Sequence, residues 1–402
     1  MCLSSVKGVL GIMDTLKREV LSQRVLKVKP SGIRRFFDII NTMPDVISLG
    51  IGEPDFVTPE HIRQAGINSI QQGHTRYTSN YGLLELREEI AAMLQRRYGL
   101  TYDPKTQLLV TVGVSEGVDL AMRTIIDPGD EVISSDPGYV AYEADIVFAG
   151  GVAVPVPTYA EYNFSVRAAD IAAAITPRTK MILLGNPNNP TGAVIPREEL
   201  EKIAKLAVEH DLIVASDEVY SRLVYNVEHV SIATFPGMQE RTLLLDGFSK
   251  AYAMTGWRIG YVAAPPHILE AMLKVHQYTI MCAGTSAQEA ALEALRHGEN
   301  DALTMRDDYA RRGRMFVDGL NRIGLSCCEP RGAFYAFPQI SHTGMSDDEF
   351  VEKLLMEEQV AVVPGSSFGV AGTGYIRCAY CTATNKLEEA LIRMERFLKR
   401  HG

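Results

Sequence analysis

The chain has 402 residues, of which 46% are hydrophobic and 22% charged, and its formal net charge is −9. This length can hold two domains with a large buried core, and the composition is ordinary for a soluble globular protein. The acidic balance argues against nonspecific nucleic-acid binding, which depends on a basic surface. No apolar run approaches the length of a membrane span, so no membrane partner is expected.

The N-terminal residues 1–12 are mildly apolar, but they contain one lysine and no convincing cleavage site. They are therefore interpreted as an extension or a misassigned start before Met13, and not as a signal peptide.

Six irregularly spaced cysteines do not make a disulfide scaffold, so a cytoplasmic location is expected. Cys378 and Cys381 have the spacing of metal ligands, but residues three apart in a strand point to opposite faces. No metal site is predicted.

Short apolar runs alternate with helical patterns from about residue 45 to 295. The predicted strands are residues 46–49, 108–112, 131–134, 180–184, 212–216, 242–245 and 259–263. Several are almost continuously apolar, as expected of strands covered on both faces. One helix is expected after Thr58-Pro59, a plausible N-cap with proline in the first turn, and another over residues 197–210. The alternation predicts an α/β fold, in which residues 46–295 form a large domain with a mostly parallel seven-stranded sheet flanked by helices.

The pattern changes after about residue 295. A long polar helix over about residues 300–322 precedes short strands at 333–337 and 375–379. The chain ends in an amphipathic helix whose apolar stripe contains Leu387, Leu391, Met394 and Leu398. Residues 296–402 are therefore predicted to form a smaller α+β domain. The N-terminal segment, residues 1–45, is expected to pack on that domain or on a partner subunit.

One segment combines a strand-like run with a lysine and an arginine. Residues 247–258 read Gly-Phe-Ser-Lys-Ala-Tyr-Ala-Met-Thr-Gly-Trp-Arg, which puts Lys250 in a Ser/Gly turn after a strand. A partly desolvated lysine has a lowered pKa and an amine that can attack a carbonyl. Arg258 can hold a phosphate with its planar fork. The segment predicts a Schiff-base lysine that holds a phosphorylated aldehyde cofactor, and the alternative is a surface lysine and arginine after a core strand.

Residues 112–117 read Val-Gly-Val-Ser-Glu-Gly, follow a predicted strand and open a helix. A glycine turn at a helix N-terminus presents backbone N–H groups to a phosphate. The same residues fit the Gly-x-Ser-x-Gly elbow of a serine hydrolase, with Ser115 as the nucleophile. A plain tight turn is the third interpretation, and this motif alone does not choose among them.

Three further segments also follow predicted strands. Asn189 lies in the run Asn-Pro-Asn-Asn-Pro-Thr-Gly, whose two Asn-Pro steps favour a stiff turn and can each adopt a cis bond. Asp217 is placed to pair with a cationic ring nitrogen, Tyr220 to hydrogen-bond a phenolic oxygen, and Tyr139 to lie flat on an aromatic ring. The structural alternatives are a rigid loop for Asn189, a helix N-cap for Asp217, and core packing for the two tyrosines. In open α/β sheets ligands bind at this edge, which supports the functional interpretation of Asn189. Taken alone, Asp217 and the two tyrosines favour the structural alternatives.

Arg377 lies inside an apolar strand, Tyr-Ile-Arg-Cys. A buried arginine must find an anionic partner, and a substrate α-carboxylate is a suitable bidentate one. The alternatives are an internal salt bridge or an exposed edge.

These segments, in this order, resemble the fold-type-I pyridoxal-phosphate aminotransferases of class I. The resemblance runs from about residue 31 to residue 400 and includes residues 48–55, 77–87 and 363–366. An ordered set of motifs is far more specific than any one of them. It implies a pyridoxal 5'-phosphate enzyme with the fold-type-I architecture and a homodimer with shared active sites.

The resemblance also implies a role for each matching residue. Lys250 matches the Schiff-base lysine and the base for the 1,3-proton transfer, Asp217 the partner of the pyridine nitrogen, Tyr220 and Asn189 the partners of the ring 3-oxygen, Tyr139 the ring-stacking residue, Arg258 the phosphate-binding arginine, Val114 and Ser115 the phosphate-binding turn, Tyr77 a phosphate contact to the neighbouring subunit, and Arg377 with Gly52 the α-carboxylate clamp. One departure is Gly247, because many relatives have a serine there that contacts the phosphate.

The implied reaction transfers an amino group from an L-amino acid to 2-oxoglutarate by a ping-pong mechanism. An aromatic or broad donor is favoured, because some aspartate-type relatives place a lysine at the position of Ser115. An aspartate or N-acetyl-diaminopimelate aminotransferase is the alternative within the family. Within the same cofactor class, the rival is a lyase or racemase with the same apparatus. The alternatives from other classes are a serine hydrolase using Ser115 and a regulator that has lost catalysis. The hydrolase leaves Lys250, Asp217 and Asn189 without a role.

Overall fold

The computed structural model describes residues 20–28, 43 and 45–401, and the chain divides into two units, Met1–Pro30 and Ser31–Gly402. In the first unit the described part contains helix α2 (Gln23–Lys27), none of whose residues is buried. All other described elements belong to the second unit. The expected packing of residues 1–45 falls largely on residues outside the described ranges and stays a prediction.

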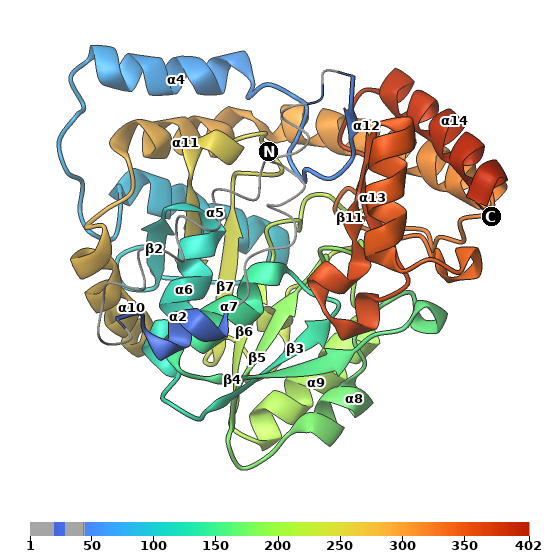
Figure 1. Ribbon diagram of the computed structural model, residues 1–402. Coiled ribbons are helices and arrows are strands. Elements are labelled where there is room, and N and C mark those ends of the chain that lie inside the picture. The colour runs from blue at the N-terminus through green and yellow to red at the C-terminus, as the bar shows by residue number, and fades with distance from the viewer. Residues whose placement is uncertain (1–19, 29–42, 44, 402) are drawn as a thin grey trace. The chain divides into compact units, whose positions relative to one another are not determined.

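A seven-stranded sheet is the centre of the second unit (Figure 1). Its strands are β2 (Leu108–Thr111), β3 (Glu131–Asp136), β4 (Val152–Pro157), β5 (Thr179–Gly185), β6 (Ile213–Asp217), β7 (Thr242–Gly247) and β8 (Gly260–Ala263). They are arranged in the order β2-β8-β7-β6-β5-β3-β4. Only β8 runs antiparallel to its neighbours β2 and β7, which confirms the prediction of a mostly parallel α/β sheet.

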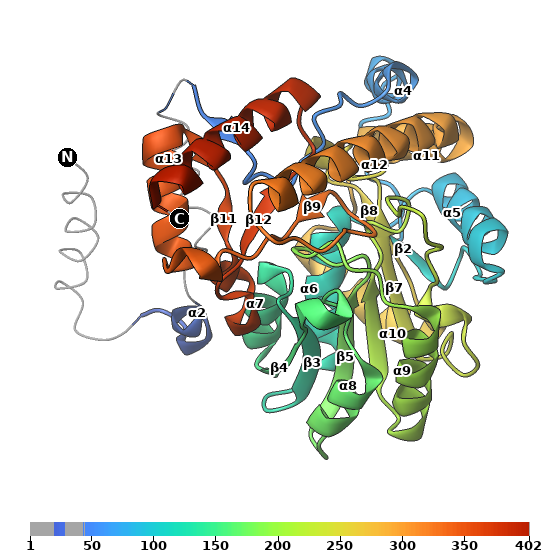
Figure 2. The same cartoon turned by 90° about the vertical axis from the view of Figure 1, so that its right-hand side faces the viewer.

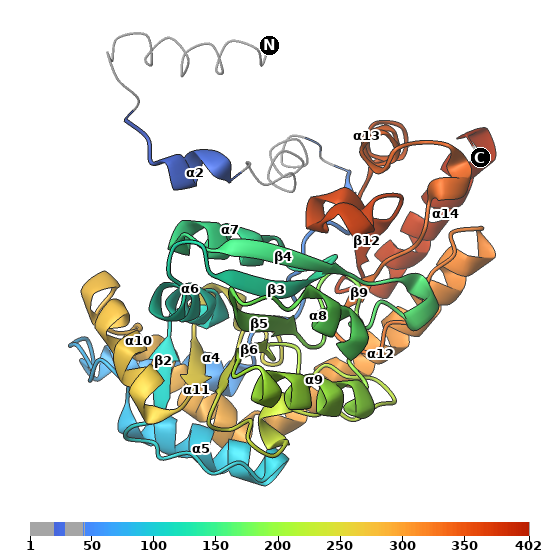
Figure 3. The same cartoon turned by 90° about the horizontal axis from the view of Figure 1, so that it is seen from below.

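Helices cover both faces of this sheet (Figure 3). Helices α6 (Gly113–Ile125), α7 (Val140–Ala149) and α10 (Pro266–Thr279) pack on one face. Helices α4 (Glu60–Gln71), α5 (Leu84–Tyr98), α8 (Ala168–Ala174), α9 (Arg197–Glu209) and α11 (Thr285–His297) belong to the two apolar clusters of the other face. The strands are almost continuously apolar because both of their faces are buried.

The alternation of side chains along β5 illustrates this arrangement. Met181 and Leu183 are fully buried against α6 and its neighbours, whereas Ile182 and Leu184 are buried in the cluster that contains α8 and α9. Successive residues of a strand point to opposite faces, so a run of large apolar residues serves two cores at once.

One strand assigned to the large sheet from the sequence is wrong, and one strand of that sheet was not predicted. Residues 46–49 do not join the large sheet, because β1 (Ile47–Ser48) pairs with β10 (Val360–Ala361) in a separate two-stranded sheet. The seventh strand is instead β4, which pairs with β3 at the edge of the sheet. Its sequence Val-Ala-Val-Pro-Val-Pro contains two prolines, which a central strand excludes but an edge strand tolerates.

The C-terminal part of the chain forms a second, smaller sheet with helices beside it. Strands β9 (Tyr335–Ala336), β11 (Val363–Pro364) and β12 (Ile376–Ala379) form an antiparallel sheet in the order β11-β12-β9. Helices α12 (Glu299–Arg322), α13 (Asp347–Glu358) and α14 (Thr384–His401) lie beside it (Figure 2). The predicted long polar helix, the two short strands and the final amphipathic helix are all present.

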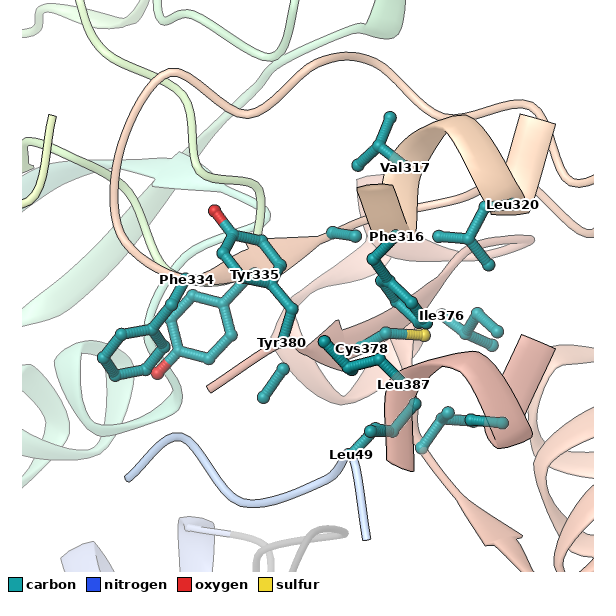
Figure 4. Close-up of a cluster of buried hydrophobic side chains, with 14 of the residues drawn as sticks. Leu49, Phe316, Val317, Leu320, Phe334, Tyr335, Ile376, Cys378, Tyr380 and Leu387 are labelled. Atoms are coloured by element: carbon teal, nitrogen blue, oxygen red, sulfur yellow. The ribbon is translucent and has the colours of Figure 1, made fainter. Parts of the chain in front are cut away.

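These elements share one apolar core (Figure 4). Leu387 of α14, Phe316 of α12 and Ile376 of β12 point into it, together with Leu49 from the segment after β1. Tyr335 and Phe334 lie at the side of the same cluster, where it meets the large sheet. Because Leu49 packs here, the segment that follows β1 is anchored in this core. The division into domains at residues 45 and 295 stays a prediction.

The start of α4 differs from the expected cap. Pro59 occupies the N-cap position, and no side chain caps the helix. The Thr58 hydroxyl instead donates to the carbonyl of Ala253, at 2.6 Å. A polar residue before a helix can thus hydrogen-bond a distant loop, which the local sequence does not reveal.

Short 3₁₀ helices complete the secondary structure at Ala160–Tyr162, Ile232–Thr234, Thr255–Trp257, Ser341–Thr343, Gly365–Phe368 and Val370–Gly372. No helix among the described residues is long and apolar enough to cross a membrane.

Candidate active site

A cavity of about 400 Å³ lies at the carboxyl edge of the large sheet. It is lined by ten residues singled out from the sequence: Gly52, Val114, Ser115, Tyr139, Asn189, Asp217, Tyr220, Lys250, Arg258 and Arg377. They come from loops that follow β1, β2, β3, β5, β6 and β7 and from strand β12. The fold thus brings into one cavity residues that are up to 325 positions apart, from Gly52 to Arg377.

Lys250 projects into this cavity from the loop after β7. Its Nζ donates to the carbonyl of Gly52 at 2.8 Å and lies near the rings of Tyr220 and Phe334. Burial lowers the pKa of Lys250 to about 8, because a charged ammonium loses its water shell there. The amine is therefore far easier to deprotonate than that of a surface lysine.

Asp217 ends β6 with its carboxylate at the base of the cavity. Its Oδ2 accepts a hydrogen bond from the Tyr142 hydroxyl at 2.8 Å, and its Oδ1 accepts one from the backbone N–H of Val219 at 3.2 Å. Burial raises the pKa of Asp217 to about 6, and no ion pair within the described residues compensates it. The N-cap alternative does not apply, since a turn and not a helix follows Asp217.

Two pairs of polar side chains connect the cavity walls. The hydroxyls of Tyr220 and Tyr335 are 2.7 Å apart, and Nη1 of Arg377 donates to Oδ1 of Asn189 at 2.9 Å. The amide of Asn189 is thereby oriented with its oxygen toward Arg377, so its NH₂ group points elsewhere. Both Asn-Pro peptide bonds in this loop are cis.

Arg377 is a buried cation without an anionic partner. Its side chain is packed between the rings of Tyr335 and Phe368, and Nη2 donates to the carbonyl of Gly50 at 2.6 Å. Only 4% of the residue is exposed, its Nε has no hydrogen-bond partner, and no carboxylate of the described residues forms an ion pair with it. The salt-bridge alternative is therefore excluded for these residues, and an anionic ligand would supply the missing partner.

The turn before α6 and the loop after β7 meet on another side of the cavity. Gly113 has φ +74°, and a Cβ at this position would lie 2.6 Å from Nη2 of Arg258. The guanidinium group thus lies directly over the glycine turn, beside the first N–H groups of α6. A positive fork facing a helix N-terminus is an arrangement that binds phosphate.

The close packing around residue 247 explains why a glycine occupies this position. A Cβ there would lie 3.1 Å from atoms of Gly260, Ile259 and Val114, so the position has little room for a side chain. Ser249, two residues later, is buried and lines the cavity.

The structure adds three residues that the sequence did not single out. Tyr142 and Tyr335 hydrogen-bond predicted site residues, and Ser249 lines the cavity. Tyr142 lies in the first turn of α7, three positions after the N-cap residue Tyr139, and the two rings meet edge to face with centroids 5.5 Å apart. Tyr335 carried no local signal, because its partners are distant in sequence.

The hydrolase alternative has no support in the geometry. Ser115 lines the cavity, but among the described residues no histidine hydrogen-bonds its hydroxyl. His276 is buried and bonded to Glu116, and His229 is bonded to Tyr98 and to the carbonyl of Asn186. A serine nucleophile needs an adjacent base, which these contacts do not provide. Within the described ranges there is also no group of three or more side chains suited to a metal ion.

Tyr77 is the one predicted site residue outside the cavity. It lies before α5 with 79% of its surface exposed and does not line the site of its own chain. Its predicted role in a neighbouring subunit stays a prediction.

Comparison with known proteins identifies the family. Residues 44–394 match the family described as "Aminotransferase class I and II". The chain is 55% identical to the putative aminotransferase YugH of Bacillus subtilis, over 94% of this chain and 98% of that protein. It is 45% identical to aromatic-amino-acid aminotransferase 2 of Thermococcus litoralis and 46% identical to an aspartate aminotransferase of Pyrococcus abyssi, each over 94% of this chain and 98% of the relative.

A solved structure agrees with these relatives. The aromatic aminotransferase of Pyrococcus horikoshii superimposes with a TM-score of 0.87 at 45% identity, covering 91% of this chain and 99% of that one. Members of this family use pyridoxal 5'-phosphate. The chain therefore belongs to the class I and II aminotransferases, as a fold-type-I enzyme that depends on pyridoxal phosphate.

Proposed function

We propose that this aminotransferase takes an L-amino acid with an aromatic or large apolar side chain as donor and 2-oxoglutarate as acceptor, in a ping-pong sequence. The observation that carries the donor class is the charge of the cavity. The cationic residues that line it are Lys250, Arg258 and Arg377, counted over the described residues. Each has a role toward the cofactor or the α-carboxylate, so the described residues of this chain that line the cavity offer no further cation for a distal carboxylate.

The residues present suit pyridoxal phosphate. The Gly113 turn and Arg258 offer a phosphate cradle that a Cβ would fill, and Asp217 offers a buried carboxylate without a cationic partner. The orphaned Nε of Arg377 is available for an anion beside the cofactor. When bound, the cofactor supplies the electron sink that makes removal of the Cα proton possible.

The roles of the protein side chains follow from charge and position. Lys250, with a pKa lowered to about 8, would hold the cofactor's aldehyde carbon through its amine and would carry the proton at Cα. Asp217, whose carboxylate accepts a hydrogen bond from Tyr142, would supply the negative charge that pairs with the pyridine nitrogen. Tyr220 and Asn189 are the donors to the ring 3-oxygen, and Tyr139 is the stacking surface.

Substrate binding uses the other wall. Arg377 takes the α-carboxylate with its guanidinium group, helped by the backbone of Gly52. Val114, Ser115 and Arg258 hold the phosphate. A homodimer in which Tyr77 reaches the neighbouring site, and a cytoplasmic location, complete the proposal.

The alternative substrates are acidic. Relatives named aspartate aminotransferase, and one named probable N-acetyl-LL-diaminopimelate aminotransferase at 42% identity, have similar overall identities to the chain. Identity alone does not discriminate among these donors, so the proposal depends on the cavity's charge.

A screen of single half-reactions tests the donor class. The holoenzyme is mixed with each amino acid in turn, and the loss of the cofactor's visible absorbance is recorded. Phenylalanine and tyrosine are expected to react with kcat/KM at least about tenfold above aspartate, because an uncompensated carboxylate in the cavity is costly. Reaction with aspartate and glutamate but not with phenylalanine or tyrosine would contradict the proposal.

Two additions sharpen this screen. Ser115→Lys supplies the cation that some aspartate-type relatives have. It should therefore raise the kcat/KM for aspartate relative to that for phenylalanine. Analysis of products with 2-oxoglutarate separates transamination, which forms glutamate, from the lyase and racemase alternatives, which do not.

A further inference from the structure

A second buried polar cluster lies beneath the loops that carry the site residues. Its titratable members are Glu218, Asp246 and His229, with Arg97 of α5 as a neighbouring cation. None of the four lines the cavity. The reaction as proposed gives them no part, although burying two carboxyl groups is expensive.

Glu218 holds the loop after β6. Its Oε1 is 2.6 Å from the Ser231 hydroxyl and 3.0 Å from the Ser216 hydroxyl, and its backbone N–H donates to the carbonyl of Leu245 at 2.7 Å. Its neighbours in sequence, Asp217 and Tyr220, face the cavity. The side chain of Glu218 therefore anchors from behind the loop that presents both of them.

His229 extends the cluster to the loop after β5. Its Nε2 lies 3.1 Å from the carbonyl of Asn186, and its Nδ1 lies 3.0 Å from the Tyr98 hydroxyl. A carbonyl can only accept, so Nε2 carries the proton and Tyr98 donates to Nδ1. Burial lowers the pKa of His229 to about 3, so the ring is neutral. Its contact with Asn186 restrains the segment that leads to Asn189.

Asp246 extends the cluster to the loop after β7. Its Oδ1 accepts from the backbone N–H of Gly247 at 2.6 Å, and its Oδ2 accepts from Ser221 at 3.2 Å and from Tyr261 at 3.3 Å. The Ser221 N–H in turn donates to the carbonyl of Glu218 at 2.7 Å. The turn that leads to Lys250 is thereby connected to the loop of Asp217.

The cluster has more acid than base. Glu218 faces Asp246 of β7, His229, and Arg97, Tyr98 and Tyr102 on or after α5. His229 is neutral, Arg97 donates to Ser221 at 3.2 Å and not to either carboxylate, and Arg222 pairs with Glu299. One partly shared cation for two buried carboxyl groups favours a single ionised one.

The hydrogen bonds indicate which carboxyl group keeps its charge. Asp246 receives three donors, one of them a backbone N–H that cannot reverse its direction. Glu218 faces two serine hydroxyls, which donate or accept equally well, and its buried Oε2 has no hydrogen-bond partner among the described residues. The 3.7 Å from Oε2 to Nε2 of neutral His229 is no ion pair. Burial and then the nearby Asp246 raise the pKa of Glu218 to about 8.

We propose that Glu218 is a positioning residue that works as an uncharged acid, joining the loops of Asn189, Asp217 and Lys250 into one rigid frame for the cofactor. The proposal rests on the cofactor roles of those three residues. It does not depend on the donor class, so a failed substrate screen leaves it intact.

Glu218→Gln tests the charge, because glutamine has the shape and the hydrogen-bonding capacity of the neutral acid. Pyridoxal phosphate is titrated into the apoenzyme at pH 7 and binding is followed by fluorescence. Glu218→Gln should bind within about threefold of the parent, whereas Glu218→Ala, which removes the anchor, should bind at least about tenfold more weakly. Glu228→Gln, an exposed glutamate ten residues away, is the matched control and should change neither binding nor stability.

The pH dependence of stability gives a second readout. The folded pKa of Glu218, about 8, lies above the ordinary value of 4.5, so the folded state binds the extra proton between these two values. Stability contributed by this group is therefore lost as pH rises through that window. Glu218→Gln lacks this loss, so its melting temperature should rise relative to the parent from pH 5 to pH 8.5, while Glu228→Gln shows no such trend.

Two results would overturn the proposal. One is a Glu218→Gln protein that binds pyridoxal phosphate as weakly as Glu218→Ala, since the charge would then be required. The other is a difference in melting temperature between Glu218→Gln and the parent that does not change with pH. If Glu218→Ala does not fold, the comparison of Glu218→Gln with the parent still tests whether the charge is required. Infrared spectroscopy provides a further test. The carbonyl stretch of a protonated carboxyl group should be present in the parent and absent in Glu218→Gln.

Discussion

Lys250 and Arg377 are two cations that the fold removes from water in different ways. Lys250 responds with a pKa lowered to about 8, because its ammonium form loses hydration without gaining a carboxylate. Arg377 cannot lose its proton, so it stays charged beside Tyr335 and Phe368 with one N–H unpaired. The first is thereby prepared to react and the second to bind an anion.

The lowered pKa of Lys250 predicts the pH dependence of cofactor uptake. At pH 7 a pKa of about 8 leaves about one amine in ten uncharged, compared with about one in three thousand for an ordinary lysine. The rate at which the apoenzyme takes up pyridoxal phosphate should rise up to about pH 8 and then level off, as measured by visible absorbance. A rate that keeps rising tenfold per pH unit to pH 10 would contradict this. Lys250→Ala should show no uptake band at any pH.

Replacement of Arg377 should affect the substrate and spare the cofactor. Arg377→Gln removes two charge-assisted hydrogen bonds to a carboxylate, so kcat/KM for the amino acid should fall roughly a hundredfold or more, about 3 kcal/mol. Titration should find the affinity for pyridoxal phosphate within about threefold of the parent. Arg311→Gln, which removes an exposed guanidinium on α12, is the control. Equal losses in cofactor and substrate affinity would argue against the clamp.

At the scale of elements, the site depends on loops that follow parallel strands. β3, β5, β6 and β7 end side by side, so the loops after them converge although they are distant in sequence. These positions were predictable, because apolar runs followed by Gly, Pro and Asn mark strand ends clearly. The identity of the edge strand was not, since β4 has two prolines and the short β1 resembles a sheet strand while it pairs with β10.

The turn at the start of α6 allows a matched pair of substitutions. Gly113 and Gly129 both have positive φ, +74° and +95°, but only Gly113 contacts the cavity, through Arg258. Each change to alanine should lower the free energy of unfolding by about 1 kcal/mol, because the left-handed conformation is strained for a Cβ. Gly113→Ala should also weaken pyridoxal phosphate binding about tenfold by displacing Arg258, whereas Gly129→Ala should not. Equal cofactor affinities in the two variants would contradict the cradle.

At the scale of the whole molecule, the predicted role of Tyr77 depends on whether the protein forms a dimer. It is exposed on its own chain, and the predicted contact with a neighbour's phosphate requires a second copy. Sedimentation velocity should therefore find a dimer. Tyr77→Phe should weaken pyridoxal phosphate binding about tenfold, the value of a hydrogen bond to a charged group, and the exposed Tyr159→Phe should not.

Mixed dimers test whether the sites are shared. A dimer of one Lys250→Ala chain and one Tyr77→Phe chain has one site with both Lys250 and Tyr77 intact only if Tyr77 acts across the interface. Such mixtures should regain a class of sites with parental cofactor affinity. If every site in the mixture binds as in Tyr77→Phe alone, Tyr77 does not act on the neighbour.

The sequence by itself determined most of the alternation of strands and helices, because periodicity, turn residues and strand ends are local properties. The ten residues that line the cavity followed from the ordered set of motifs and its family resemblance. Only the tertiary structure decided what those residues contact. Asn189 and Arg377 are 188 positions apart, Tyr220 and Tyr335 are 115 apart, and Tyr142 and Asp217 are 75 apart. The buried frame of Glu218, His229 and Asp246 was invisible in the sequence for the same reason. A hydrogen-bond partner and the loss of water around a charge are set by neighbours in space, and these are what adjust the pKa of Lys250 and leave Arg377 ready for an anion.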